Sequence, residues 1–255
     1  MLCYIPVGYK GQGLRAVLIG QYSLTNHFLN SMLIGKHRLD RFRFLFFAIL
    51  TMIGLRPIIT ECIGGGIWLD AVTDVFFAGA LLAGLMAVKS QPKQFWMALI
   101  LVGTITLLEF IHYTMPIKIL DKLQLGLGAV FFIQMLVMIT THIKNETQVT
   151  LDLIMAAACS YVLLGMIWAY AYYFLESFHP HSFAAGSGVL EDLWDFHYYS
   201  FVTLTTVGYG DILAKSKSAQ ALTVLEAIVG QLYLAILISR LVGLHASQLH
   251  SDIKN

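Results

Sequence analysis

The chain has 255 residues, of which 58% are hydrophobic and only 12% are charged. Soluble domains carry about 25% charged residues, so this composition predicts a membrane protein. A net charge of +1 without a basic patch argues against nucleic acid as a partner, and Cys3, Cys62 and Cys159 match no metal-binding spacing.

The N-terminal segment, residues 1–41, is expected to be cytoplasmic. Residues 1–15 lack the charged and apolar regions of a secretory leader. Residues 16–34 are apolar in places but are interrupted by polar side chains, so we expect a helix that lies on the membrane surface.

Six later stretches approach the roughly 20 apolar residues that a membrane span needs. They are residues 42–60, 67–88, 95–111, 123–143, 153–175 and 219–242. The sequence therefore predicts an all-α membrane protein with six transmembrane helices. Eleven Lys and Arg residues fall on the side of the N-terminus and five on the other, which predicts a cell-membrane protein with both termini in the cytoplasm.

The connection between the last two spans, residues 176–218, is expected on the outer side. Its first part, 176–193, is predicted to be an exposed extracellular segment. Residues 194–206 (WDFHYYSFVTLTT) are apolar but too short to span, which favours a helix that enters the membrane and returns. We therefore expect a re-entrant pore helix followed by a polar loop.

The loop after this helix has the residue types of an ion path. Gly208 and Gly210 can adopt positive φ, so alternate peptide carbonyls can turn to one side and replace the water around a cation such as K⁺. Val207 and Tyr209 would then point outward against neighbouring helices, and the Thr206 hydroxyl would add an oxygen. One strand cannot surround an ion, so this interpretation predicts a homotetramer.

Residues 205–211 (TTVGYGD) resemble the selectivity filter of potassium channels, and the resemblance covers residues of about 150–245. It implies passive, K⁺-selective permeation without an enzyme activity, and no cofactor besides K⁺ itself. The implied filter residues, whose carbonyls or hydroxyl would ligate K⁺ or shape the strand, are Thr206, Val207, Gly208, Tyr209 and Gly210.

The same resemblance implies supporting roles around the filter. Tyr198 and Tyr199 occupy the place of an aromatic pair in the pore helix, and Thr205 precedes the filter. Asp211 is expected to form a hydrogen bond behind the filter, with Tyr199 as its partner. Gly230 lies where the family's inner helix often has a hinge glycine.

The surrounding sequence distinguishes this loop from a chance match. Residues 6–11 (PVGYKG) also contain Val-Gly-Tyr, but no short helix precedes them and no two spans bracket them, so we interpret them as a turn. The predicted organisation is an N-terminal segment, a four-helix membrane domain, a pore domain and a short cytoplasmic tail, at 1–41, 42–146, 147–245 and 246–255.

The fourth span departs from the pattern of voltage-gated relatives. Residues 123–143 contain no Lys or Arg, so we expect weak or no voltage dependence. Residue 202 is Val, where some members of the family carry a Glu. The short tail leaves regulation to the membrane part, lipid, pH or a separate regulatory subunit.

Two sets of titratable residues keep two interpretations each. Glu226 in the sixth span is either a proton-sensitive element or a protonated, hydrogen-bonded packing residue. Gln231 is either the partner of Glu226 or faces the cavity. His179, His181 and His197 are either an external pH sensor or ordinary surface and helix-end histidines.

Three other classes of protein remain as alternatives. A transporter built on filter-like loops needs four such loops in one chain, whereas this sequence has one in context. A regulatory subunit that is silent alone would not need an intact filter. An enzyme would need a metal triad, nucleophile motif or phosphate loop, and the sequence contains none.

Overall fold

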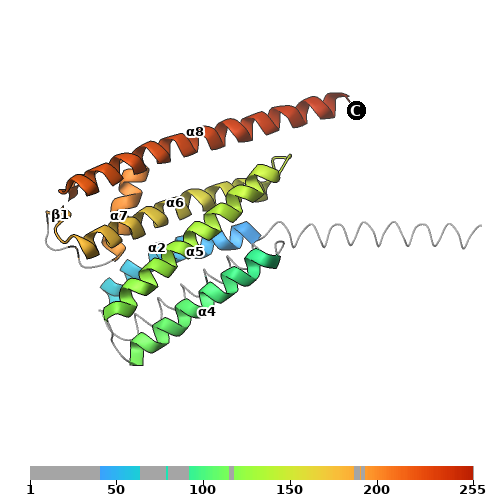
Figure 1. Ribbon diagram of the computed structural model, residues 1–255. Helices are drawn as coiled ribbons and strands as arrows, with labels where there is room; N and C mark the ends of the chain where they lie inside the picture. The colour runs from blue at the N-terminus through green and yellow to red at the C-terminus, as the bar shows by residue number, and fades with distance from the viewer. Residues whose placement is uncertain are drawn as a thin grey trace, which may run out of the picture. The chain divides into compact units, whose positions relative to one another are not determined.

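The computed structural model describes residues 41–63, 79, 92–114, 118–186, 190 and 193–254. These residues form helices α2, α4, α5, α6, α7 and α8 with two short strands, β1 and β2 (Figure 1). The expected surface helix at 16–34, the turn at 6–11 and the expected span at 67–88 lie outside the described residues, apart from Gly79.

Three helical stretches among the described residues are long and apolar enough to cross a membrane. They are Lys122–Asn145, Leu151–Phe178 and Lys217–Gln248. The apolar parts of two further helices, Phe42–Leu55 and Trp96–Leu108, are shorter. The expectation of a helical membrane protein is therefore confirmed, whereas the count of six spans stays a prediction.

The long helices are α2 (Arg41–Ile63), α4 (Pro92–Thr114), α5 (Lys118–Asn145), α6 (Leu151–Phe178) and α8 (Lys217–Lys254). The 38 residues of α8 measure about 57 Å at 1.5 Å per residue, well beyond a hydrocarbon core of about 30 Å. Because no proline interrupts α8, the residues expected to form the tail continue this helix as far as Lys254.

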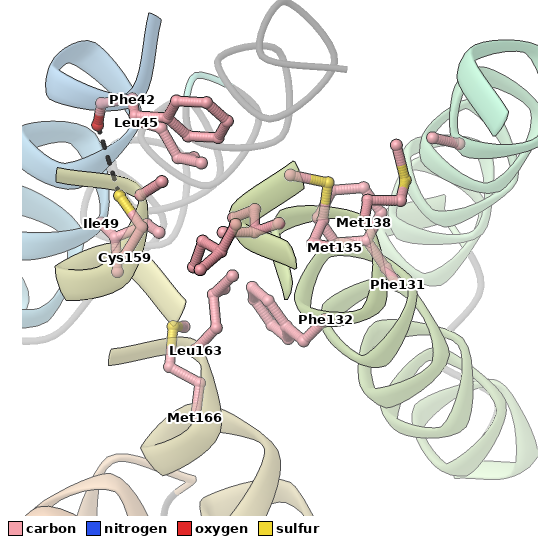
Figure 2. Close-up of a cluster of buried hydrophobic side chains, with 14 of the residues drawn as sticks. Phe42, Leu45, Ile49, Phe131, Phe132, Met135, Met138, Cys159, Leu163 and Met166 are labelled. Carbon is pink, nitrogen blue, oxygen red and sulfur yellow. Dashed lines mark hydrogen bonds between the residues drawn. The ribbon is translucent and has the colours of Figure 1, made fainter. Parts of the chain in front are cut away.

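Helix α6 is the centre of the described structure, because it contacts α2, α5, α7 and α8. Figure 2 shows apolar side chains of α2, α5 and α6 meeting in one buried cluster. Cys159 of α6 is fully buried there, and its Sγ lies 3.3 Å from the carbonyl oxygen of Phe42. Cys159 is therefore a small apolar side chain of the core.

Arg240 joins the far part of α8 to the end of α5. One guanidinium nitrogen, Nη2, donates to the carbonyl oxygens of Ile143, Lys144 and Glu146 at 2.8, 2.7 and 3.4 Å. The last carbonyls of a helix have no partner within it and carry partial negative charge, so an arginine is a favourable cap.

The connection after α6 is more ordered than the sequence suggested. β1 (Phe183–Ala185) pairs antiparallel with β2 (Ile212–Ala214), so residues before α7 are tied to residues after it. Phe183 is buried, and both carboxylate oxygens of Glu176 accept backbone N–H groups of this turn. The prediction of a wholly exposed segment at 176–193 is therefore wrong, since an aromatic side chain anchors it.

Candidate functional site

The candidate site consists of α7 (Leu193–Leu204) and the loop 205–211 that follows it. Twelve residues make a helix of about 18 Å, too short to cross a bilayer. α7 contacts both α6 and α8, and it lies beside α6 in Figure 1. Its buried residues recur at helical spacing and define one face, Phe196, His197, Tyr199, Ser200 and Leu204.

Aromatic rings hold the buried face of α7 against α6 and β1. The ring centroid of Tyr172 lies 5.1 Å from that of Tyr199, with the rings at 71°. Phe183 lies 5.3 Å from Phe196 and from Tyr199, and Tyr173 lies 5.6 Å from Phe196. The Tyr173–Phe196 pair is tilted, whereas the other three pairs meet edge to face, an arrangement that is favourable beyond the area it buries. Aromatic residues of α6 thus pack against this short helix.

The C-terminal end of α7 is fixed from both neighbouring helices. The hydroxyl of Tyr161 in α6 donates to the carbonyl oxygen of Leu204 at 3.1 Å. On the other side, a Cβ added to Gly230 of α8 would lie 2.7 Å from Leu204 Cδ1 and 3.1 Å from its carbonyl oxygen. Gly230 therefore permits a close approach of α8 to α7, and α8 passes through it without interruption.

The first residues of the loop fold back on α7. The backbone N–H groups of Val207 and Gly208 both donate to the carbonyl oxygen of Val202, at 3.0 and 3.2 Å. The Thr205 hydroxyl donates to the carbonyl oxygen of Phe201 at 2.6 Å. These bonds hold the start of the loop against the last turn of α7.

The backbone of the loop alternates in the sign of φ. Thr206, Gly208 and Gly210 have φ of 60°, 57° and 78°, while the residues between them have no positive φ. Reversing φ at every second residue can turn successive carbonyls toward one side, whereas the carbonyls of an ordinary strand alternate. The two glycines make this inexpensive.

Thr206 was not expected in the left-handed region. A β-branched residue with positive φ is a genuine outlier, and such strain of about 1–3 kcal/mol persists only where the surroundings impose it. The signal was present in the sequence, because Thr206 precedes Gly208 by the same two residues that separate Gly208 from Gly210.

The side chains of the loop are exposed within the single chain. Val207 is 54% exposed and Tyr209 is 71% exposed. Tyr209 stacks on Tyr198 of α7, with centroids 6.4 Å apart and rings 5° from parallel. The expected packing of Val207 against neighbouring helices is not met by this chain.

Asp211 bonds to Tyr198, and the expectation that Tyr199 is its partner is wrong. The Tyr198 hydroxyl donates to Asp211 Oδ2 at 2.6 Å, and the Ile212 N–H donates to Oδ1 at 3.1 Å. Tyr199 lies instead on the buried face of α7, where its hydroxyl is 2.7 Å from Thr223 Oγ1. Adjacent residues of a helix point in different directions, so only one of the two tyrosines can reach the loop.

The Tyr198–Asp211 bond shifts the titration of both groups. The hydrogen bond lowers the pKa of Asp211 below its ordinary value and raises the pKa of Tyr198 to about 12. At neutral pH the carboxylate is therefore charged and the phenol is neutral, which are the states that the bond requires.

The three histidines considered as a pH sensor do not share one environment. His179 and His181 are exposed, whereas His197 is 4% exposed on the buried face of α7. Its Nδ1 lies 2.9 Å from the carbonyl oxygen of Leu193, and its ring meets that of Tyr170 edge to face. His197 therefore does not belong to a surface cluster.

Glu226 of α8 is fully buried between α6 and α7. Its carboxyl group bonds to the hydroxyls of Tyr172 and Ser200. Gln231, a candidate partner of Glu226 from the sequence, is exposed and does not bond to it. The two hydroxyls were not foreseen, since they are distant in sequence and meet only when three helices pack.

No group of three or more His, Cys, Asp or Glu side chains able to hold a metal occurs in the described part of the chain. The oxygens of residues 205–210 are backbone carbonyls and the hydroxyls of Thr205, Thr206 and Tyr209. Such uncharged oxygen ligands suit a hard, weakly held cation rather than a tightly bound transition metal.

Comparison with known protein families gives a match to this part of the chain. Residues 160–244 match the model of a family described as ion channel. The matched segment covers most of α6 and all of α7, the loop, β2 and the first part of α8. No match was found among curated proteins.

We expect Tyr198→Phe to raise the pKa of Asp211 toward the ordinary value of about 3.9, because the donor that stabilises the carboxylate is lost. In the unsubstituted chain the bond persists until the pH falls through the lowered pKa, so the variant loses its charge at higher pH. NMR titration of isotope-labelled aspartate measures this shift. Tyr199→Phe is the matched control and should leave the pKa of Asp211 unchanged; an equal effect of both changes would contradict the assignment.

Gly230→Ala should destabilise the protein by about 1–3 kcal/mol, because the added methyl group meets the backbone of Leu204 as well as its side chain. Gly243→Ala is the matched change in the same helix, where a Cβ meets nothing within 4 Å. It should be neutral or slightly stabilising through helix propensity. Thermal unfolding in detergent compares the two; equal midpoints would refute the close approach.

Proposed function

We propose, from the premise that residues 160–244 are an ion-channel domain, that the chain is one subunit of a tetrameric potassium-selective channel. The observation that carries this proposal is the alternation of φ along the loop, at Thr206, Gly208 and Gly210. Permeation is passive, through a path that four copies of residues 205–211 surround.

The loop supplies the kind of ligand that potassium requires. The carbonyls of residues 206–209 and the Thr206 hydroxyl replace the water shell of the ion, as carbonyl rings do in potassium channels. No carboxylate lies within residues 205–210, which disfavours a ring built for divalent cations. Asp211 follows directly, and its carboxylate is engaged by Tyr198 and the Ile212 N–H.

The position of α7 supports the same function. α7 acts as a re-entrant pore helix whose C-terminal end, at Leu204, precedes the loop at once. The C-terminal end of a helix carries partial negative charge, which favours a cation nearby. Non-helical backbone at membrane depth is tolerated where it is buried in protein or lines water, as a filter does.

Exposed apolar surface supports assembly of several copies. One face of α8 exposes Leu225, Ile228, Leu232 and Ile236 by half or more of their surface. Val207 and Tyr209 of the loop are also exposed. Four subunits related by a central axis cover these side chains or turn them toward a shared cavity, which one chain cannot do.

The described helix α5 lacks the charges of a voltage sensor. Its Lys residues lie at its ends, Lys118, Lys122 and Lys144, and none lies within 123–143. Gating in this proposal therefore does not draw on the roughly 2.3 kcal/mol per 100 mV that each transferred charge supplies. Lipid, pH or a separate regulatory subunit provides the gating stimulus. The channel lies in the cell membrane, and both ends of the chain are in the cytoplasm.

Gly208→Ala should abolish potassium flux into liposomes that contain the purified protein. The added Cβ meets nothing within 4 Å, so the change acts by penalising φ of 57° rather than by a clash. Gly126→Ala in α5, also without contacts within 4 Å, is the control and should conduct normally. Unchanged flux in Gly208→Ala would remove the filter assignment, and equal flux of sodium and potassium would remove the selectivity.

The conductance in planar bilayers should change little with membrane voltage, because residues 123–143 carry no Lys or Arg that could move in the field. Current recorded from purified protein at symmetric potassium over positive and negative voltages tests this. A steep sigmoidal conductance–voltage relation would refute it and would require gating charge elsewhere.

A further inference from the structure

Glu226 lies where the three helices α6, α7 and α8 meet. It is fully buried on α8, and its partners come from the other two helices, Tyr172 from α6 and Ser200 from α7. The other titratable groups that face it are Tyr161 of α6 and Tyr199 of α7. No cationic side chain among the described residues contacts it.

The protonation state of Glu226 can be argued from the number of hydrogen atoms that its contacts require. The Tyr172 hydroxyl bonds to Glu226 Oε2. Ser200 Oγ lies 2.5 Å from Glu226 Oε1 and 2.7 Å from the carbonyl oxygen of Gly165 in α6. Three oxygen–oxygen contacts of hydrogen-bond length therefore need three hydrogens between their atoms.

The two hydroxyl groups supply only two of these hydrogens. The carbonyl of Gly165 can only accept, and an ionised carboxylate can only accept as well. If Glu226 were ionised, Ser200 would have a single hydrogen for two acceptors, and one contact would be left without any. If Glu226 is protonated, its own hydrogen completes the set.

We infer that Glu226 is a neutral carboxylic acid that donates to Ser200 Oγ, accepts from Tyr172 and so positions the short helix α7 between α6 and α8. Ser200 then passes its own hydrogen to the carbonyl of Gly165. The carboxylic acid is a positioning residue and touches no ion. The inference rests on the proposed function only where it identifies α7 as the pore helix.

This arrangement controls the end of α7 that carries the loop. Ser200 lies one helical turn before Leu204, whose carbonyl and side chain are fixed by Tyr161 and Gly230. Loss of the Glu226 hydrogen would leave an unpaired acceptor and a buried charge with no cation beside it, both of which are unfavourable. The neutral acid therefore holds the rotation and depth of α7.

Infrared difference spectroscopy of purified protein at neutral pH tests the inference directly. The spectrum of the unsubstituted protein minus that of Glu226→Gln should contain the C=O stretch of a protonated carboxylic acid, a region free of amide and carboxylate bands. A difference that contains carboxylate bands instead would overturn the inference, whatever the protein conducts.

Glu226→Gln also tests whether the side chain at position 226 donates a hydrogen bond to Ser200. Its amide NH₂ can donate to Ser200 Oγ and its C=O can accept from Tyr172, so it reproduces the neutral acid. We expect its thermal midpoint and potassium flux to match those of the unsubstituted protein, while Glu226→Ala loses both stability and flux. If Gln proves as damaging as Ala, the carboxyl group is not the donor.

A pH profile distinguishes positioning from packing alone. Flux of the unsubstituted protein should fall at alkaline pH, where the acid ionises, and Glu226→Gln should not show that fall. If the potassium flux of the two proteins falls equally at alkaline pH, Glu226 has no positioning role. The Gly208→Ala result is independent, since an acid band in a protein that conducts no potassium would retain this inference and reject the proposed function.

Discussion

The packing of α7 between α6 and α8 is the constraint on which the candidate site depends. A helix of about 18 Å is too short to cross a bilayer, and α7 is held by its contacts with α6 and α8. The aromatic rings of Tyr172, Phe183 and Phe196 provide the contact surface, and Tyr161 takes the carbonyl of Leu204 at the end of the helix. The position of α7 in turn fixes where the loop 205–211 begins.

The strained backbone of the loop becomes intelligible in that setting. Thr206 keeps an unfavourable φ because the chain is held on both sides of it. Before it, the Thr205 N–H donates to the carbonyl oxygen of Phe201; after it, the N–H groups of Val207 and Gly208 donate to that of Val202. The strand pair β1–β2 holds the far end of the loop, where the Gly186 N–H donates to the Asp211 carbonyl at 3.0 Å. A local conformation that few residues adopt is thus imposed from several directions.

Part of this arrangement could be predicted from the sequence. A short apolar segment before a glycine-rich loop, between two long apolar runs, predicts a helix like α7 because length and composition alone exclude a span. The glycines also indicated positive φ at 208 and 210, which the backbone has. These features depend on local chemistry, so a single sequence contains them.

Features that depend on helix rotation and on long-range packing could not be predicted. Both Tyr198 and Tyr199 are close enough in sequence to serve Asp211, and only the burial of Tyr199 against α6 and α8 decides between them. The partners of Glu226 lie 54 and 26 residues away, and neither is marked by any pattern. The strand pairing at Phe183 was missed for the same reason.

The uncovered surface of α8 has a consequence for what stability means in this protein. Only 11% of its apolar window is buried within the chain, against 61% for α6. Lipid or neighbouring copies must therefore supply the contacts that hold α8, so its free energy of folding contains terms from outside the chain. The midpoint of unfolding therefore depends on the amphiphile that surrounds the protein, and in any assembly of several copies it depends on the concentration of subunits as well.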